Sequence, residues 1–200
     1  MSKHSTSKAY NLDDIEQRAR DIYANESEGQ QQLLDVWEGI PAHDQHRYPD
    51  IAFHTAKVHI NQGHNALARA RLTICGDAWK GEPEKLARVY LIHAYLCKLE
   101  HDFEGLRQFI AQAQLLSKSE TLLAECQYLL GDAVLTTDPT EALQHYDEAR
   151  QRYVRASVMN RDATFDAVRA SLRAAYVAFQ QNMNVVGWQY QHYAEEAAHQ

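Results

Sequence analysis

The sequence predicts an all-helical chain of about ten helices in five antiparallel pairs. Its 200 residues contain only four prolines and eight glycines, so long stretches have no residue that breaks a helix. Ala, Leu, Gln, Glu and Arg are abundant, and alternating runs of Val, Ile and Thr, which are typical of strands, do not occur. Between residues 86 and 118, apolar residues recur at three- and four-residue steps in two successive segments, which is the pattern of a helical hairpin. One hairpin cannot bury both apolar stripes, so neighbours of the same kind are expected.

The remaining helices follow from similar apolar stripes between short polar breaks. We expect residues 1–10 to form a disordered lead and residues 11–200 to form a single helical-repeat domain. Asn11 can cap the first helix, and Pro83 with Glu84 suits the first turn of the hairpin at 86–118. The expected segments are 12–22 and 32–38 with a break at 25–29, then 51–61 and 65–75, the hairpin 86–118, 122–135 and 141–155, and 163–181 and 185–198.

Small residues recur at a spacing that suits close packing of two helices. Such a pair needs a small residue on the first helix, another about twelve positions later on its partner, and a third about seven further on. Four sets follow this spacing: Ala56, Ala68 and Cys75; Ala94, Leu106 and Ala113; Gly131, Ala142 and Ala149; and Ala175, Gly187 and Ala194. The second set has Leu106 in place of a small residue, and the third is one residue short between its first two members.

These positions resemble those of the tetratricopeptide repeat (TPR). The best local matches are HDFEGLRQFIAQA at 101–113 and DPTEALQHYDEA at 138–149, which look like the turn and second helix of that repeat. The resemblance covers roughly residues 50–198, with a weaker candidate at 12–39, and its repeats are longer than the usual 34 residues. In this respect they resemble divergent repeats of bacterial regulatory and peptide-receptor proteins. The resemblance implies a right-handed α-α superhelix, a TPR-like solenoid, whose first helices line a concave groove.

The resemblance also implies which side chains face the groove, because these fall at fixed offsets from each first-helix anchor. Together they combine aromatic and cationic groups, which are common anchors of interfaces. A partner peptide with acidic and apolar side chains would fit them. The alternative is that the rings pack between repeats, with the Lys and Arg stems around them. The residues of the predicted groove are Phe53, Lys57, Arg88, Leu91, Tyr95, Lys98, Tyr128, Arg169 and Tyr176. The family's carboxylate clamp is not carried over.

The last helix suggests a second interface. A terminal helix normally turns a polar face to water, but residues 185–198 carry Trp188, Tyr190 and Tyr193 around much of the circumference. One stripe can pack on the preceding helix, which leaves another to be covered. We therefore expect a homodimer or a partner contact there.

Composition and motifs exclude several other classes of function. The net charge of −7 disfavours general binding to nucleic acid or to anionic membranes, and the arginines at 150–173 are balanced by neighbouring carboxylates. No signal peptide or membrane span is recognisable, and Cys75, Cys97 and Cys126 form no C-x-x-C pair, so a cytoplasmic protein with reduced core cysteines is expected. The histidines have no metal-binding spacing, and no catalytic or phosphate-binding motif occurs. We expect no metal, no cofactor and no enzymatic activity.

The sequence therefore favours a non-enzymatic protein-interaction module, acting as an adaptor, chaperone or regulator, that binds a partner peptide or helix in the groove. One alternative is a regulatory sensor that responds to a small molecule or a signalling peptide. Another is a structural protein that assembles with itself through its C-terminal helix.

Overall fold

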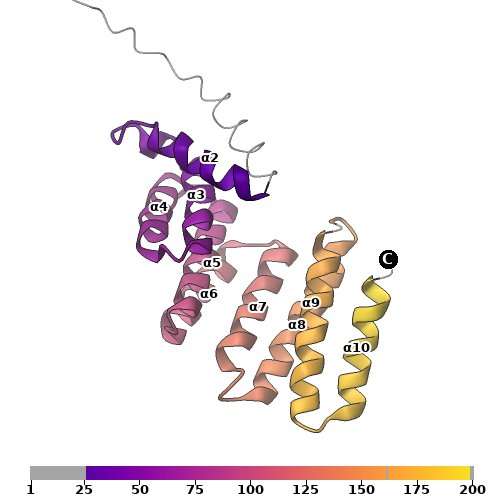
Figure 1. Cartoon of the computed structure of the whole chain (residues 1–200). Helices are drawn as coiled ribbons and strands as arrows, with labels where there is room; N and C mark the ends of the chain where they lie inside the picture. The colour runs from indigo at the N-terminus through magenta and orange to yellow at the C-terminus, as the bar shows by residue number, and fades with distance from the viewer. Residues whose placement is uncertain (1–25, 161, 199–200) are drawn as a thin grey trace, which may run out of the picture. The chain divides into compact units, whose positions relative to one another are not determined.

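The computed structural model of the chain describes residues 26–160 and 162–198, and that part contains nine α-helices, one short 3-10 helix and no strand. The chain divides into two compact units, residues 1–80 and 81–200, which are described separately here. Helices that are neighbours in the sequence pack against each other within each unit (Figure 1). The expected all-helical class is thereby confirmed for the described residues. The superhelix and the single domain at 11–200 remain predictions.

The first unit consists of α2 (Glu26–Glu38), the 3-10 helix η1 (Gln45–Arg47), α3 (Pro49–Asn61) and α4 (Asn65–Ala78). Gly63 has a φ of 75° in the turn between α3 and α4, a conformation that glycine adopts readily. Leu33 and Trp37 of α2 are buried, as is Ile51 of α3, so the inner faces of these helices supply the core.

Two expectations for the start of the chain need comment. The helix expected at 12–22 lies outside the described residues. The break expected at 25–29 is wrong over residues 26–29, because α2 begins at Glu26 and includes Gly29. One glycine costs a helix only about 1 kcal/mol, and the Glu and Gln residues around it are good helix formers.

The second unit consists of six helices in chain order. They are α5 (Pro83–Leu99), α6 (Phe103–Leu116), α7 (Glu120–Val134), α8 (Pro139–Ser157), α9 (Asp162–Gln180) and α10 (Asn184–Ala198). Side chains of Asp102, Ser119 and Asp138 accept hydrogen bonds from backbone N–H groups at the starts of α6, α7 and α8. These caps explain why short breaks suffice to end one helix and begin the next.

The small residues identified from the sequence occupy the helix contacts. Every one of these anchor positions is buried. A Cβ atom on Gly131 would lie 2.8 Å from the Tyr146 ring, and one on Gly187 would lie 2.6 Å from the Phe179 ring. The spacing therefore predicted correctly where α7 meets α8 and where α9 meets α10.

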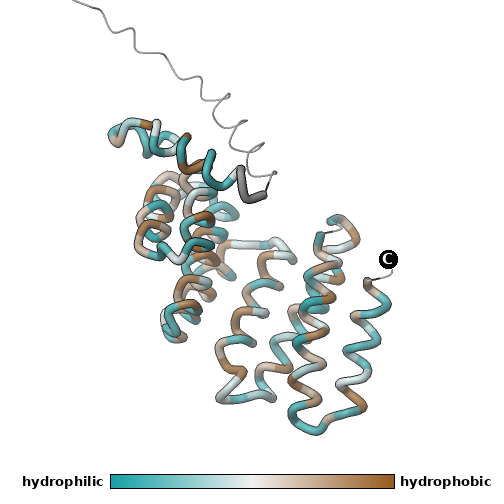
Figure 2. The backbone as a smooth tube through the Cα atoms, viewed as in Figure 1, coloured by the Kyte–Doolittle hydropathy of each residue, from teal (hydrophilic) through white to brown (hydrophobic). Residues whose placement is uncertain are grey.

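Figure 2 shows hydrophobic and hydrophilic residues alternating along the helices, as expected for helices with one buried face. Within the described part of the chain, no helix combines the length and the apolar character needed to cross a membrane.

Candidate interaction site

The candidate site is built on α7 and α9 of the second unit. Glu125, Tyr128 and Asp132 are three and four residues apart on α7, so their side chains share one face of that helix. Arg169, Arg173 and Tyr176 follow the same rule on α9. Hydrogen bonds and ring contacts between the two sets, described next, show that these faces meet.

Glu125 joins α7 to both α8 and α9. Its carboxylate accepts a hydrogen bond from the Tyr153 hydroxyl and another, 2.7 Å long, from Nη2 of Arg169. Arg169 also pairs with Asp166 and lies over the Tyr128 ring, with Cζ 4.3 Å from the ring centroid. Burial alone would lower the pKa of Arg169, but Glu125 and the other acidic groups around it raise the pKa overall. Arg169 is thus a paired cation rather than an unengaged one.

Asp132 makes the corresponding contacts one heptad later on α7. Its side chain is only 6% exposed, accepts a hydrogen bond of 2.6 Å from the Tyr146 hydroxyl and forms an ion pair with Lys98 of α5. Lys98 also lies near the Tyr95 ring, at 5.7 Å. Burial and the hydrogen bond to Asp132 raise the pKa of Tyr146. The charge of Lys98, like that of Arg169, is therefore neutralised within the chain.

An open pocket of about 550 Å³ lies beside these contacts. Its lining consists mostly of apolar side chains and two arginines, namely Tyr128, Phe165, Val168, Arg169, Leu172, Arg173 and Tyr176. Phe165 is 76% exposed and Tyr176 52% exposed, so large apolar groups face solvent along α9. An apolar patch of this kind on a protein surface is typical of an interaction site.

Arg173 differs from the other cations of the surface. Its Nε donates a hydrogen bond of 3.2 Å to the Tyr128 hydroxyl, and this bond raises the pKa of Arg173. The negative charge of Asp132 on α7 also raises the pKa of Arg173, but no ion pair between the two is found among the described residues. The only hydrogen bond found for Arg173 in that part of the chain is made by Nε, so its two Nη groups can bind a ligand.

The structure brings some of the predicted groove residues together. Tyr128, Arg169 and Tyr176 line the pocket. Lys98 of α5 forms an ion pair with Asp132 of α7 and lies near the Tyr95 ring, but neither Tyr95 nor Lys98 lines the pocket. Arg88 is exposed on α5, whereas Leu91 is half-buried against the core of the second unit.

Phe53 and Lys57 belong to the first unit. There the Phe53 ring packs 5.6 Å from the Trp79 ring, so it serves packing within that unit. The predicted groove did not include Phe165, Val168 or Arg173 of the lining, whereas the offsets from Ala175 do select Leu172. The spacing of Phe165 and Val168 from Leu172 was the signal that could have identified these two residues.

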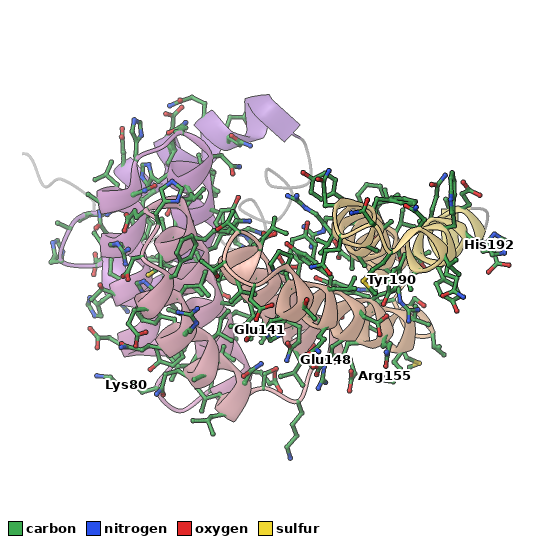
Figure 3. All side chains as sticks on the ribbon, turned by 90° about the horizontal axis from the view of Figure 1, so that it is seen from below. Lys80, Glu141, Glu148, Arg155, Tyr190 and His192 are labelled. Carbon is green, nitrogen blue, oxygen red and sulfur yellow. The ribbon has the colours of Figure 1, made fainter. Side chains whose placement is uncertain are left out.

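The C-terminal helix retains an exposed aromatic face. Trp188 is 61% exposed and makes an edge contact with Phe179, with ring centroids 5.4 Å apart. Tyr190 of α10 is half-buried and lies beside α8 (Figure 3). Cζ of Arg150, on α8, lies 5.9 Å from the centroid of its ring. Tyr193 is exposed, although the same arginine lies 4.8 Å from its ring. The aromatic face noted in the sequence is therefore only partly used within the chain.

The cysteines lie in the core of the described part of the chain. Cys75, Cys97 and Cys126 are buried thiols. Within the described residues, no group of three or more His, Cys, Asp or Glu side chains is placed to hold a metal ion. Burial raises the pKa of Cys75 and Cys126 to about 12.

Comparison of the chain with models of protein families, with curated proteins and with solved structures finds no match.

Proposed function

We propose that the chain is a protein-interaction module that binds a segment of a partner protein on the surface formed by α7 and α9. The exposed apolar lining of the pocket carries this proposal, because burying such groups against a partner is favourable by about 25 cal/mol per Å² of apolar surface. The resemblance of the anchor positions to tetratricopeptide repeats supports it, since the first helices of that family line a binding groove.

The shape of the pocket favours a macromolecular segment over a small molecule. Small-molecule sites bury most of their ligand, whereas Phe165 and Tyr176 leave this pocket open along one side. The proposal therefore places the adaptor role ahead of the sensor role.

The proposal is tested by affinity capture from native lysate, read by mass spectrometry. The variant is Leu172→Asp, which places a charge in the pocket, and the matched control is Leu115→Asp, at a site 80% exposed on α6. Partners retained by the wild type and the control but lost by Leu172→Asp would support the proposal. If the wild type and Leu172→Asp capture the same partners, it fails. A charge reversal at Lys98, another residue of the predicted groove, would not test binding alone. Lys98→Glu would place a second carboxylate beside the buried side chain of Asp132 and so destabilise the fold.

The exposed Trp188 favours a second candidate, self-association through α10. Val185 and Tyr193 are exposed on the same helix, so a second copy of the chain could cover this apolar face. Sedimentation velocity would then detect a dimer of the wild type that Trp188→Asp converts to a monomer, with Leu115→Asp as the control. A wild type that stays monomeric at high concentration would exclude it.

A further inference from the structure

Four apolar side chains of α9, three of them exposed and one half-buried, form a row with the geometry of a helix-binding surface. Phe165, Val168, Leu172 and Tyr176 are three, four and four residues apart, so they lie along one face of α9. The opposite face is buried and consists largely of alanines. At 1.5 Å per residue the row is about 16 Å long, which matches three turns of a partner helix.

The polar groups of the pocket do not suit an extended peptide. An extended segment buries unpaired backbone N–H and C=O groups, and each one left without a partner weakens binding. The lining contains no Asn, Gln, Ser or Thr, and its free polar groups, the Nη groups of Arg173 and the hydroxyls of Tyr128 and Tyr176, are too few to pair the backbone of a segment that spans the row. A helix satisfies its own backbone groups, so it can bury an apolar face here without that cost.

Charge complementarity identifies one polar feature of the partner. Of the two arginines in the lining, Arg169 forms ion pairs with Glu125 and Asp166. Arg173 is influenced by the charge of Asp132 but has no ion pair among the described residues, and its Nη groups have no hydrogen bond there. Asp132, on the facing helix α7, is already engaged by Lys98 and Tyr146. The forked guanidinium of Arg173 matches the two oxygens of a carboxylate.

We propose that the pocket binds the apolar face of an amphipathic partner helix of about three turns, and that Arg173 binds an Asp or Glu side chain at the edge of that face. This inference rests on the proposed function, because it specifies the partner of the same surface.

The experiment is a display selection against the full chain with a library of two arms of equal diversity. In one arm the randomised positions lie on the exposed face of a fixed helical scaffold, and in the other they lie in a linear peptide flanked by Gly and Ser. Selected binders are then measured against wild type, Leu172→Asp, Arg173→Gln and Arg173→Lys. Arg107→Gln, on α6, is the matched control, and circular dichroism verifies that each variant is folded.

The expected binders come from the helical arm, with apolar residues at i, i+3 or i+4 and i+7 and an acidic residue at a constant offset. Arg173→Gln should weaken their binding at least about tenfold, because it removes a charge-assisted hydrogen bond to the carboxylate. Arg173→Lys should restore only part of the affinity, because lysine lacks the fork.

Two outcomes would overturn the inference, and they differ in what else they overturn. Binders that come from the linear arm, or that tolerate Arg173→Gln, but are lost with Leu172→Asp would refute the acidic helix and leave the proposed function standing. If no binder is selected, or if binders tolerate Leu172→Asp, both the inference and the proposed function fail.

Discussion

Replacing Gly131 by alanine tests the closeness of α7 and α8, on which the site depends. The added Cβ would lie 2.8 Å from Cε1 of Tyr146 and 3.0 Å from two more ring atoms, whereas carbon atoms pack best at about 3.5–4.0 Å. The ring cannot easily withdraw, because Tyr146 is fully buried and its hydroxyl is bound to Asp132. Gly131→Ala must therefore displace either the ring or the helix.

The magnitude follows from two opposing effects. Overpacking a core costs about 1–3 kcal/mol, and a ring held in this way places the cost near the upper end. Alanine gains about 1 kcal/mol over glycine inside a helix. The net loss is about 2 kcal/mol, which lowers the thermal midpoint of a chain of this size by about 4–8 °C.

Gly76→Ala is the matched control for this substitution. Gly76 also lies within a helix, α4, but a Cβ there would meet nothing within 4 Å. This variant should gain up to about 1 kcal/mol. Thermal and urea unfolding, followed by far-UV circular dichroism, would measure both. If Gly131→Ala were as stable as the wild type while Gly76→Ala gained stability, the close contact between α7 and α8 would be refuted.

Three further predictions concern groups with clear structural roles. Burial and the neighbouring Glu125 raise the pKa of Tyr153, so the contribution of its hydroxyl to the free energy of unfolding is complete below the unfolded pKa of about 10 and is lost as the pH rises above that value. Between pH 9 and 11, the free energy of unfolding of Tyr153→Phe, measured by urea titration, should therefore fall less than that of the wild type. Cys75 and Cys126, with pKa values raised to about 12, should resist a maleimide at pH 8 until urea unfolds the chain, and rapid labelling of the native protein, located by mass spectrometry, would contradict their burial. Asp138→Ala removes an acceptor for two backbone N–H groups at the start of α8, so it should cost about 1 kcal/mol in urea unfolding, and an unchanged midpoint would show that the cap is dispensable.

Much of the fold could be predicted because its signals are local. Apolar periodicity, capping residues and scarce breakers determine where a helix begins and ends, and the spacing of small residues predicts which positions meet. The break at 25–29 failed because glycine often ends a helix but does not have to, as Gly29 shows. The division at residue 80 lies in the segment 76–83, which contains two glycines and a proline, but such a segment also occurs between helices of one domain. The division itself reflects contacts between residues far apart in the sequence.

The site was less predictable because it depends on which charges meet. Offsets from the anchors correctly indicated that Tyr128, Arg169 and Tyr176 lie on one surface. They could not show that Lys98 would pair with Asp132 or Arg169 with Glu125, because these partners are 34 and 44 residues away in the sequence. The alternative, in which the rings pack between repeats and the Lys and Arg stems are solvated around them, did not include these ion pairs either.

The arrangement of acids and tyrosines explains why Arg173 differs from the other cations. Glu125 and Asp132 are one heptad apart on α7, and Tyr153 and Tyr146, which bind them, are one heptad apart on α8. Each carboxylate accepts one tyrosine hydroxyl and pairs with one cation from a flanking helix, Arg169 of α9 or Lys98 of α5. Both acids are then engaged, although the charge of Asp132 still acts on Arg173 from α7. Because Tyr128 offers Arg173 a neutral hydroxyl instead of a carboxylate, the guanidinium of Arg173 lies beside the apolar row, where an acidic group of a partner can bind it.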